Sequence, residues 1–405
     1  MHTRAHDQRC LDRSLVSHRE SEPRNVIARR DWCKLLVSAG GVLLFSGEEG
    51  CGYYAAGSGA AYDPWKFPDG ETKPERVAAR AALLAANPHN SQPWAIRVTA
   101  EQIDLHADFS RNLGTMDGLL REMHIGLGCA IENMVIAARV SGRAALVTLL
   151  PDATDASLVA TLRLMPADAV ADPRYAAIAQ RHTNRGRYAD APPAATLEPT
   201  LQALVTEPGV ALRWLVSSDD KARFRGGTID ATNAINGDAD MSRDSNAWYR
   251  QTADDILTHR DGITIDASGN SAATVYLGKV TGRPSDETSN SYWLASTKGA
   301  QTVASAFGIL SSPASNARED QLSAGRVYQR MHLWAVSQGL AVQPLNQMAE
   351  RQDREEALGL TPQFTTLLGE LIGAPDRRAQ MLFRIGYPGE PANPSPRRPI
   401  EWVRL

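Results

Sequence analysis

The sequence is poor in cysteine, in dense positive charge and in long apolar runs. It has four cysteines in 405 residues, and three of them, Cys10, Cys33 and Cys51, fall close to the start of the chain. This distribution excludes a disulfide framework and a cysteine-based zinc site in the body of the protein. Cys129 remains there alone, within an apolar periodic run, so we expect a buried and inert thiol.

The balanced charge and the missing motifs argue against several common function classes. The 43 basic and 46 acidic residues nearly balance, and no dense basic block interrupts them, so no nucleic-acid partner is expected. The chain lacks a Gly-x-Ser-x-Gly elbow, a His-Glu-x-x-His helix and the third glycine of a dinucleotide fingerprint after Gly126 and Gly128. His124 and His332 fit two long helices as core or interface residues, and we predict no metal site. The expected partner is a small molecule.

Residues 1–60 form a distinct N-terminal region. Arg29 and Arg30 are followed by Trp32 and Lys34 and then by an uncharged, glycine-rich apolar stretch at 35–47, which is too short for an ordinary membrane span. The pattern resembles a twin-arginine export signal and predicts delivery by that machinery to the periplasm or cell envelope. The alternative is a buried N-terminal helix. Lipoprotein anchoring at Cys51 is not expected, because no aliphatic residue stands in the place that a lipobox requires.

The body of the chain mixes helices and strands in two halves. In residues 61–170, hydrophobic periodicity predicts helices at 77–84 and 119–141 and strands near 94–98, 103–106, 147–150 and 162–165. In residues 171–405 it predicts a helix at 173–180 and a strand at 212–216. A polar stretch at about 226–299 with scattered Trp and Tyr residues is predicted to be an insertion with local structure that covers part of the molecule.

The two halves share a weak internal repeat. An offset of 197 positions aligns Gly128 with Gly325 and Gly142 with Gly339, and it also pairs Met134 with Met331 and Ala138 with Ala335. Each set marks a long helix that ends at a glycine, where a left-handed cap is sterically easy. The repeat favours a tandem duplication, although two unrelated helices of similar composition would give the same four identities.

Two polar segments and a basic pair are the candidates for a binding site. Residues 87–94 read Asn-Pro-His-Asn-Ser-Gln-Pro-Trp, a proline-pinned loop between a helix and a strand. Residues 181–185 read Arg-His-Thr-Asn-Arg and present basic and hydroxyl groups at alternate positions, a pattern suited to phosphate. Arg397 and Arg398 stand near the end of the chain.

These segments together resemble the motifs of the nitroreductase superfamily, and more closely those of its tandem Acg-like branch of FMN-binding proteins. The family's Arg-x-Ser-x-Arg/Lys, Asn-x-Gln-Pro-Trp and C-terminal basic motifs are similar to residues 181–185, 90–94 and 384–399 of this chain. The resemblance implies an α+β fold of layered helices and sheets. In this nitroreductase-like fold, two tandem-duplicated halves form an intrachain pseudo-dimer. It also implies one FMN per chain, because neither motif has a second copy.

The resemblance further implies a role for each segment. Arg181 and Arg397 would bind the FMN phosphate, Thr183 the phosphate or ribityl chain, and Arg185 the pyrimidine end of the ring. In ordinary nitroreductases the opposite subunit supplies the other wall, which is represented here by Asn87, Pro88, His89, Asn90 and Gln92. Asn346 and Gln347 would lie near flavin N5, although the acidic residue and glycine usual there are absent.

Two functions remain open on this basis. The first is an oxidoreductase that passes a hydride from NAD(P)H through flavin N5 to a nitro compound, quinone or related acceptor. The second is a protein that sequesters or stores flavin under the predicted insertion. Each site segment also has an alternative interpretation: residues 181–188 as a solvated helix start, His89 as a loop histidine without a ligand, and Arg397 and Arg398 as a charged tail.

Overall fold

The structure is a computed structural model that describes residues 55–405. The predicted export signal and Cys51 lie outside the described residues. Within the described part, two antiparallel four-stranded sheets combine with helices, which confirms the α+β class. A short two-stranded parallel sheet of β6 (Tyr249–Arg250) and β7 (Ile263–Thr264) adds to them.

The first sheet has the strand order β1-β2-β4-β3. Its strands are β1 (Trp94–Val98), β2 (Gln102–Ala107), β3 (Arg143–Leu149) and β4 (Leu158–Pro166). Two helices pack on it: α2 (Pro74–Ala82), which begins with a proline at its first position, and α3 (Arg121–Val140). The predicted helices and strands of this half are all present, with boundaries shifted by a few residues.

The second sheet has the strand order β5-β8-β10-β9. Its strands are β5 (Ala211–Leu215), β8 (Ala306–Pro313), β9 (Ala341–Pro344) and β10 (Arg377–Gly386). The helices of this half outside the insertion are α4 (Pro173–Gln180), α5 (Leu197–Ala203), α11 (Arg318–Ser337), α12 (Gln347–Leu358) and α13 (Gln363–Ile372). Asp172 caps α4 by accepting a hydrogen bond from the backbone N–H of Arg174, and Pro173 occupies its first turn.

The two sheets repeat one topology. Counted along the chain within each sheet, the four strands lie in the spatial order first, second, fourth, third, and all neighbours are antiparallel. A 20-residue helix connects the second strand to the third in both halves, α3 in one and α11 in the other. Gly142 and Gly339 follow these helices with positive φ, as predicted for the two caps.

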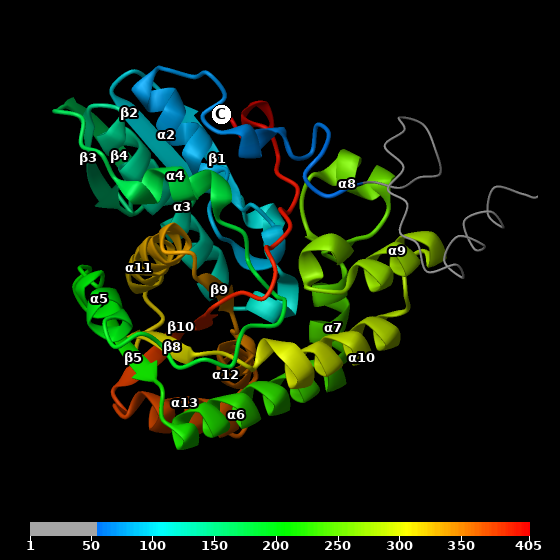
Figure 1. Ribbon diagram of the computed structural model, residues 1–405. Helices are drawn as coiled ribbons and strands as arrows, with labels where there is room; N and C mark the ends of the chain where they lie inside the picture. Colours follow the sequence, from blue (N-terminus) through cyan, green and yellow to red (C-terminus); the bar gives the residue numbers. More distant parts are fainter. Residues whose placement is uncertain (1–54) are drawn as a thin grey trace, which may run out of the picture. The chain divides into compact units, whose positions relative to one another are not determined.

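Helices α3 and α11 cross each other between the two sheets (Figure 1). A Cβ atom on Gly128 would overlap the carbonyl oxygen of Leu322, and one on Gly325 would overlap that of Ile125. The two contacts are equivalent under the 197-residue offset, which relates Ile125 to Leu322 and Gly128 to Gly325. Such reciprocity is the mark of a two-fold interface, here within one chain.

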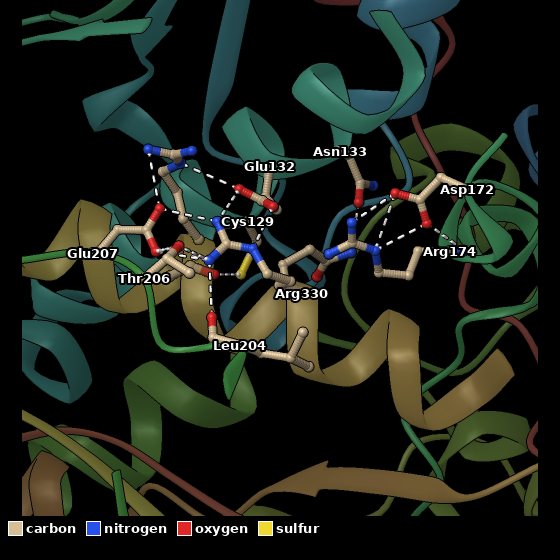
Figure 2. Close-up of polar contacts among 12 residues, drawn as sticks. Cys129, Glu132, Asn133, Asp172, Arg174, Leu204, Thr206, Glu207 and Arg330 are labelled. Atoms are coloured by element: carbon tan, nitrogen blue, oxygen red, sulfur yellow. Dashed lines mark hydrogen bonds and ion pairs between the residues drawn. The ribbon is translucent and has the colours of Figure 1, made fainter. Parts of the chain in front are cut away.

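Polar contacts beside the crossing of α3 and α11 show the same reciprocity (Figure 2). Arg330 donates to both carboxylate oxygens of Glu132 at 2.7 and 2.9 Å, and Gln329 donates to Asn133 at 2.7 Å. The 197-residue offset relates Glu132 to Gln329 and Asn133 to Arg330, so the two pairs occupy equivalent positions. Arg330 also pairs with Glu207 at 2.8 Å, so its buried charge is fully compensated.

The apolar core extends across both halves. One cluster of buried side chains includes Trp94 and Leu127 from the first half and Tyr328 and Phe383 from the second. By length and composition α3 is apolar enough to cross a membrane, but 83% of that segment is buried inside the fold, which is the environment of a core helix. Cys129 lies on α3, is buried as predicted, and donates a hydrogen bond to the carbonyl of Gly325.

The connection from β5 to β8 holds the inserted structure. It contains α6 (Ser218–Gly237), α7 (Ala239–Asn246), α8 (Ala253–His259), α9 (Ala272–Thr281) and α10 (Asp286–Ser296). The corresponding connection in the first half is the short turn between β1 and β2. The insertion therefore begins with α6, before the predicted start near residue 226, and α7 to α10 extend to one side of the two sheets (Figure 1).

The C-terminal tail returns from the second sheet to the first. After β10, backbone hydrogen bonds join Arg397 to Ala61, Ile96 to Val403 and Leu405 to Ile96. This pairing extends the edge of the first sheet next to β1. It carries Arg397 to the same region as the loop that precedes β1.

Candidate functional site

Two adjoining cavities lie where the halves meet. The larger has a volume of about 600 Å³ and the smaller about 30 Å³. Both are lined by Ala86, Asn87, Thr183 and Arg185, so the smaller one is a side pocket of the larger. A cavity of this size accommodates an organic cofactor or a comparable ligand.

The side pocket gathers buried arginines without a counter-ion. Arg181 and Arg397 are 2% and 3% exposed, and Arg185 lines the same pocket. Among residues 55–405, none of the three forms an ion pair, and Nε and Nη1 of Arg397 have no hydrogen-bond partner. Burial lowers the pKa of Arg181 to about 10 and that of Arg397 well below its usual range. The pocket is therefore electrostatically suited to an anion.

Trp65 lines this pocket and was not predicted from the sequence. Its ring lies 4.9 Å from the guanidinium of Arg397 and 5.9 Å from that of Arg181, both within cation–π range. His182 packs edge-on against it at 4.4 Å, and burial together with the two arginines lowers the pKa of His182 to about 3. No motif in the sequence marked Trp65, because it lies in a short 3-10 turn far from both polar segments.

The loop before β1 forms one wall, but two of its predicted ligands brace the loop itself. Asn90 donates to the carbonyls of Gly262 and Pro396, but it also lines the side pocket, and its Oδ1 has no partner among residues 55–405. Gln92 lines neither cavity; it donates to the carbonyl of Arg260 and accepts from the backbone N–H of Arg398. The prediction of Gln92 as a direct ligand is therefore corrected, because its amide is already used on both sides.

Asn87, Pro88 and His89 line the larger cavity. The side chain of Asn87 accepts from the backbone N–H of Gln92 at 2.8 Å and so holds the loop. His89, Asn90 and Gln92 all have positive φ, an unfavourable backbone conformation for these residue types that surrounding hydrogen bonds maintain. His89 contacts the hydroxyl of Ser245 at 3.0 Å, and burial next to Arg185 lowers its pKa to about 4.

Thr183 and Arg185 connect the two cavities. The guanidinium of Arg185 donates to the carbonyl of Ala267 in the insertion at 2.9 Å, and burial lowers its pKa. Thr183 lines both cavities. The structure thus brings together residues 87–89, 181–185 and 397 from three distant parts of the chain, as the sequence predicted.

The loop after β9 forms part of the opposite wall. Asn346 and Gln347 line the larger cavity. The Asn346 side chain accepts from the backbone N–H of Leu382 at 2.8 Å and donates to Met381, so it is engaged in the fold. The side-chain oxygen of Gln347 has no partner among the described residues, which makes Gln347 the better candidate of the two for a ligand contact.

Two carboxyl groups line the same wall and were also not predicted. Glu122 at the start of α3 and Glu350 on α12 both face the cavity. With Asp117 and Asp353 they form a carboxyl cluster around the fully buried Arg121. Burial and mutual repulsion raise the pKa of Asp117 to about 8 and raise those of Glu122 and Glu350.

These shifts predict how stability depends on pH. A carboxyl whose pKa is raised by folding stabilises the protein below its unfolded pKa, and this contribution is lost as pH rises through the folded value. A histidine whose pKa is lowered by folding, such as His89, makes the free energy of unfolding rise with pH, but only below about pH 6.5. Between pH 6.5 and 8 we therefore expect the free energy of unfolding to fall with pH, by about 1.4 kcal/mol per unit for each retained proton. Urea unfolding at several pH values measures this slope, which Glu350→Gln should make shallower.

The insertion supplies the outer wall of the larger cavity. Leu277 on α9 and Tyr292 on α10 line it and are 59% and 61% exposed, whereas Ile265 and Tyr249 lie deeper. Large exposed apolar side chains at a cavity mouth are typical of a ligand-binding surface. The insertion therefore borders the site, as predicted for a covering segment.

Two curated relatives match the chain over most of its length. No family model matches the chain. A Mycobacterium tuberculosis protein named "Putative NAD(P)H nitroreductase Rv3131" is 27% identical over 356 residues, which cover 86% of this chain and 95% of that protein. The similarity therefore extends over nearly the whole length of that relative. An uncharacterised protein of the same organism, Rv3127, is 29% identical over 80% of this chain and 91% of its own length.

Two further comparisons are more limited. The M. tuberculosis nitroreductase relative named acg is 31% identical over 134 residues, which cover 32% of this chain and 40% of that protein. Among solved structures, the FMN-dependent nitroreductase NfnB of Mycobacterium smegmatis in complex with NADPH matches at 12% identity. It has a TM-score of 0.36 and covers 57% of this chain and 96% of its own. A nitroreductase of Bacteroides fragilis with bound FMN matches at 12% identity with a TM-score of 0.32, over 56% and 95% of the two chains.

Proposed function

We propose that the chain is an FMN-dependent oxidoreductase of the nitroreductase type. The observation that carries the proposal is the side pocket, where Arg181 and Arg397 are buried without a counter-ion and Arg397 keeps two nitrogens unpartnered. A phosphate would supply the missing negative charge and several hydrogen-bond acceptors at once. The adjoining cavity of about 600 Å³ has room for a flavin ring and a second molecule beside it.

The residues of the two cavities would contact different parts of the cofactor. Arg181, Arg397 and Thr183 would hold the phosphate, and Arg185, at the junction, would lie near the pyrimidine end, where a cation favours the reduced ring. Asn87, Pro88 and His89 would line one side of the ring and Gln347 the other. When bound, the flavin would supply the redox chemistry, accepting a hydride from NAD(P)H and passing it to a nitro compound, quinone or related acceptor.

We further propose that the two halves descend from a tandem duplication and that the chain is exported by the twin-arginine route. The shared strand order and the reciprocal contacts of α3 and α11 support the first proposal. Arg29, Arg30 and the apolar stretch after them support the second. A signal-dependent reporter fusion compared with an Arg29→Lys, Arg30→Lys variant tests the export.

The competing function is flavin storage without turnover. The insertion contributes much of the outer wall of the larger cavity, and a wall that keeps nicotinamide from the ring would prevent hydride transfer. Scarcity of NAD(P)H outside the cytoplasm would also favour storage.

Anaerobic mixing of the FMN-loaded protein with NADPH separates the two functions. We expect the flavin absorbance to bleach, since the cavity has volume for a nicotinamide beside the ring. A flavin that NADPH and NADH leave oxidised, but that dithionite reduces, would support storage instead. A protein that stays colourless after incubation with FMN would contradict both functions.

A further inference from the structure

The carboxyl cluster lies at the wall of the proposed substrate cavity and is built from three segments: the turn that ends at Asp117, the start of α3, and α12. Asp117 accepts from the backbone N–H groups of Glu122 and Met123 at 2.9 and 2.8 Å and so caps the start of α3. Arg121 donates to Asp353 at 2.7 Å and to the carbonyl of Gln380 at 2.6 Å. The backbone and side-chain contacts therefore fix the geometry of the cluster.

Glu350 is the member of the cluster without a fixed partner. Its side chain is 6% exposed, lines the cavity, and has an oxygen, Oε2, with no hydrogen-bond partner among the described residues. Glu122, by contrast, accepts from Arg121 and interacts with Asn346. A buried polar atom that faces a cavity without a partner is available to a ligand.

The cluster has fewer cations than carboxyl groups. Asp117, Glu122, Glu350 and Asp353 face Arg121, and Arg378 from β10 reaches only Asp353 among them, at 2.6 Å. Arg378 also pairs with Glu356 at the surface, and the helix neighbours Arg351 and Arg354 pair with Asp238. Because two like charges in a desolvated site disfavour each other's ionisation, the cluster retains at least one proton near neutral pH.

We propose that Glu350 is a neutral carboxylic acid and the proton donor to the acceptor molecule, a quinone or similar oxygen-bearing compound. This inference rests on the proposed function. A bound, reduced cofactor would supply two electrons and one hydrogen as hydride to one quinone oxygen, and Glu350 supplies the proton. The O–H bond of Glu350 breaks while a second O–H bond forms on the other carbonyl oxygen, which yields the hydroquinone. Arg121 stabilises the resulting cluster charge, and water returns the proton.

The surroundings of Glu350 suit an acceptor with an apolar body and a polar oxygen. Ile125 and Met381 line the same cavity, and Leu277 and Tyr292 offer apolar surface near the mouth. In this setting the carboxylic acid is a hydrogen-bond donor, whereas a carboxylate would repel the electron-rich oxygen. Asp117, Arg121 and Glu122 act as positioning residues that keep the proton on Glu350.

Infrared spectroscopy tests the protonation state without any turnover. At pH 7 we expect the carboxylic C=O stretching band of the wild type to lose intensity in Glu350→Gln, with or without FMN. Glu356→Gln is the matched control, because Glu356 lies on the same helix, has a side chain that is 48% exposed and does not line the cavity. It should leave the band unchanged. Equal bands in the wild type and Glu350→Gln would overturn the inference.

Rapid mixing of the reduced, FMN-loaded protein with two acceptors tests the proton transfer. Benzoquinone needs protons, whereas ferricyanide takes single electrons and none. We expect Glu350→Gln to lower the ratio of the benzoquinone rate to the ferricyanide rate by about 100-fold, the scale of general-acid catalysis. Glu356→Gln should keep the wild-type ratio. An unchanged ratio in Glu350→Gln would refute the donor role, whereas a protein without flavin would refute the proposed function itself.

Discussion

Replacing Arg397 with methionine is expected to weaken FMN binding and, at the same time, to stabilise the ligand-free protein. Loss of two charge-assisted hydrogen bonds to phosphate costs about 3 kcal/mol or more, which is about a 100-fold increase in Kd. In the ligand-free state the same guanidinium is buried with two unpartnered nitrogens. Its removal should raise the free energy of unfolding by about 1–3 kcal/mol. Fluorescence titration with FMN and urea unfolding of the ligand-free protein measure the two effects.

Arg187→Met provides the matched control. Arg187 belongs to the same basic segment, but it is exposed and lines neither cavity. We expect both its FMN affinity and its stability to stay at wild-type values. If Arg397→Met destabilises the ligand-free protein, the guanidinium stabilises the position of the C-terminal tail, and its role as an unpaired anion-binding group is contradicted.

The substitution Gly325→Ala is expected to destabilise the fold strongly through a single added methyl group. Its Cβ would overlap the carbonyl oxygen of Ile125 and come within 2.9 Å of the Ile125 Cα, both backbone atoms of α3. Backbone atoms inside a packed helix pair move only if the helices separate, so we expect a loss of about 3 kcal/mol. Urea unfolding gives the value, and Gly128→Ala should behave alike because its contact is the reciprocal one.

Gly226→Ala is the control for the substitution itself. Gly226 lies within α6, is exposed, and has nothing within 4 Å of a built Cβ. There alanine should stabilise the protein by about 1 kcal/mol through helix propensity. Equal effects of Gly226→Ala and Gly325→Ala would mean that α3 and α11 do not pack as closely as described.

Local patterns in the sequence predicted the strands of the first sheet and, in the second half, a helix and a strand, but not β8, β10, α12 or α13. The helix over 173–180 was predicted with its observed ends, because Asp172 and Pro173 form a strong start signal and the apolar period stops at residue 180. The strands that contain Trp94 and Leu212 were predicted for similar reasons. The start of the insertion was also not predicted, because α6 has a weakly amphipathic sequence, although Ser217 caps this helix and Asp219 and Asp220 lie in its first turn.

The site was predictable where its residues belong to compact motifs and unpredictable where folding assembles it. Arg181, Thr183, Arg185 and Arg397 come together as the motifs suggested. Gln92 and Trp65 show the limits: the amide of one serves the loop backbone, and the ring of the other reaches the pocket through long-range packing. Glu350 could not be predicted from the sequence, because its carboxyl group acquires a special environment only where α3 and α12 meet.

The covalent link between the halves has a consequence for dilution. Residues 87–89 come from the first half of the chain and residues 181–185 from the second, yet they line the same cavities within one polypeptide. In a site shared by separate subunits, mass action empties the site when the protein is diluted below the dissociation constant of the dimer. Here the effective concentration of one wall relative to the other is set by the connecting chain and does not change. The site can therefore persist at copy numbers too low to sustain an assembly of subunits.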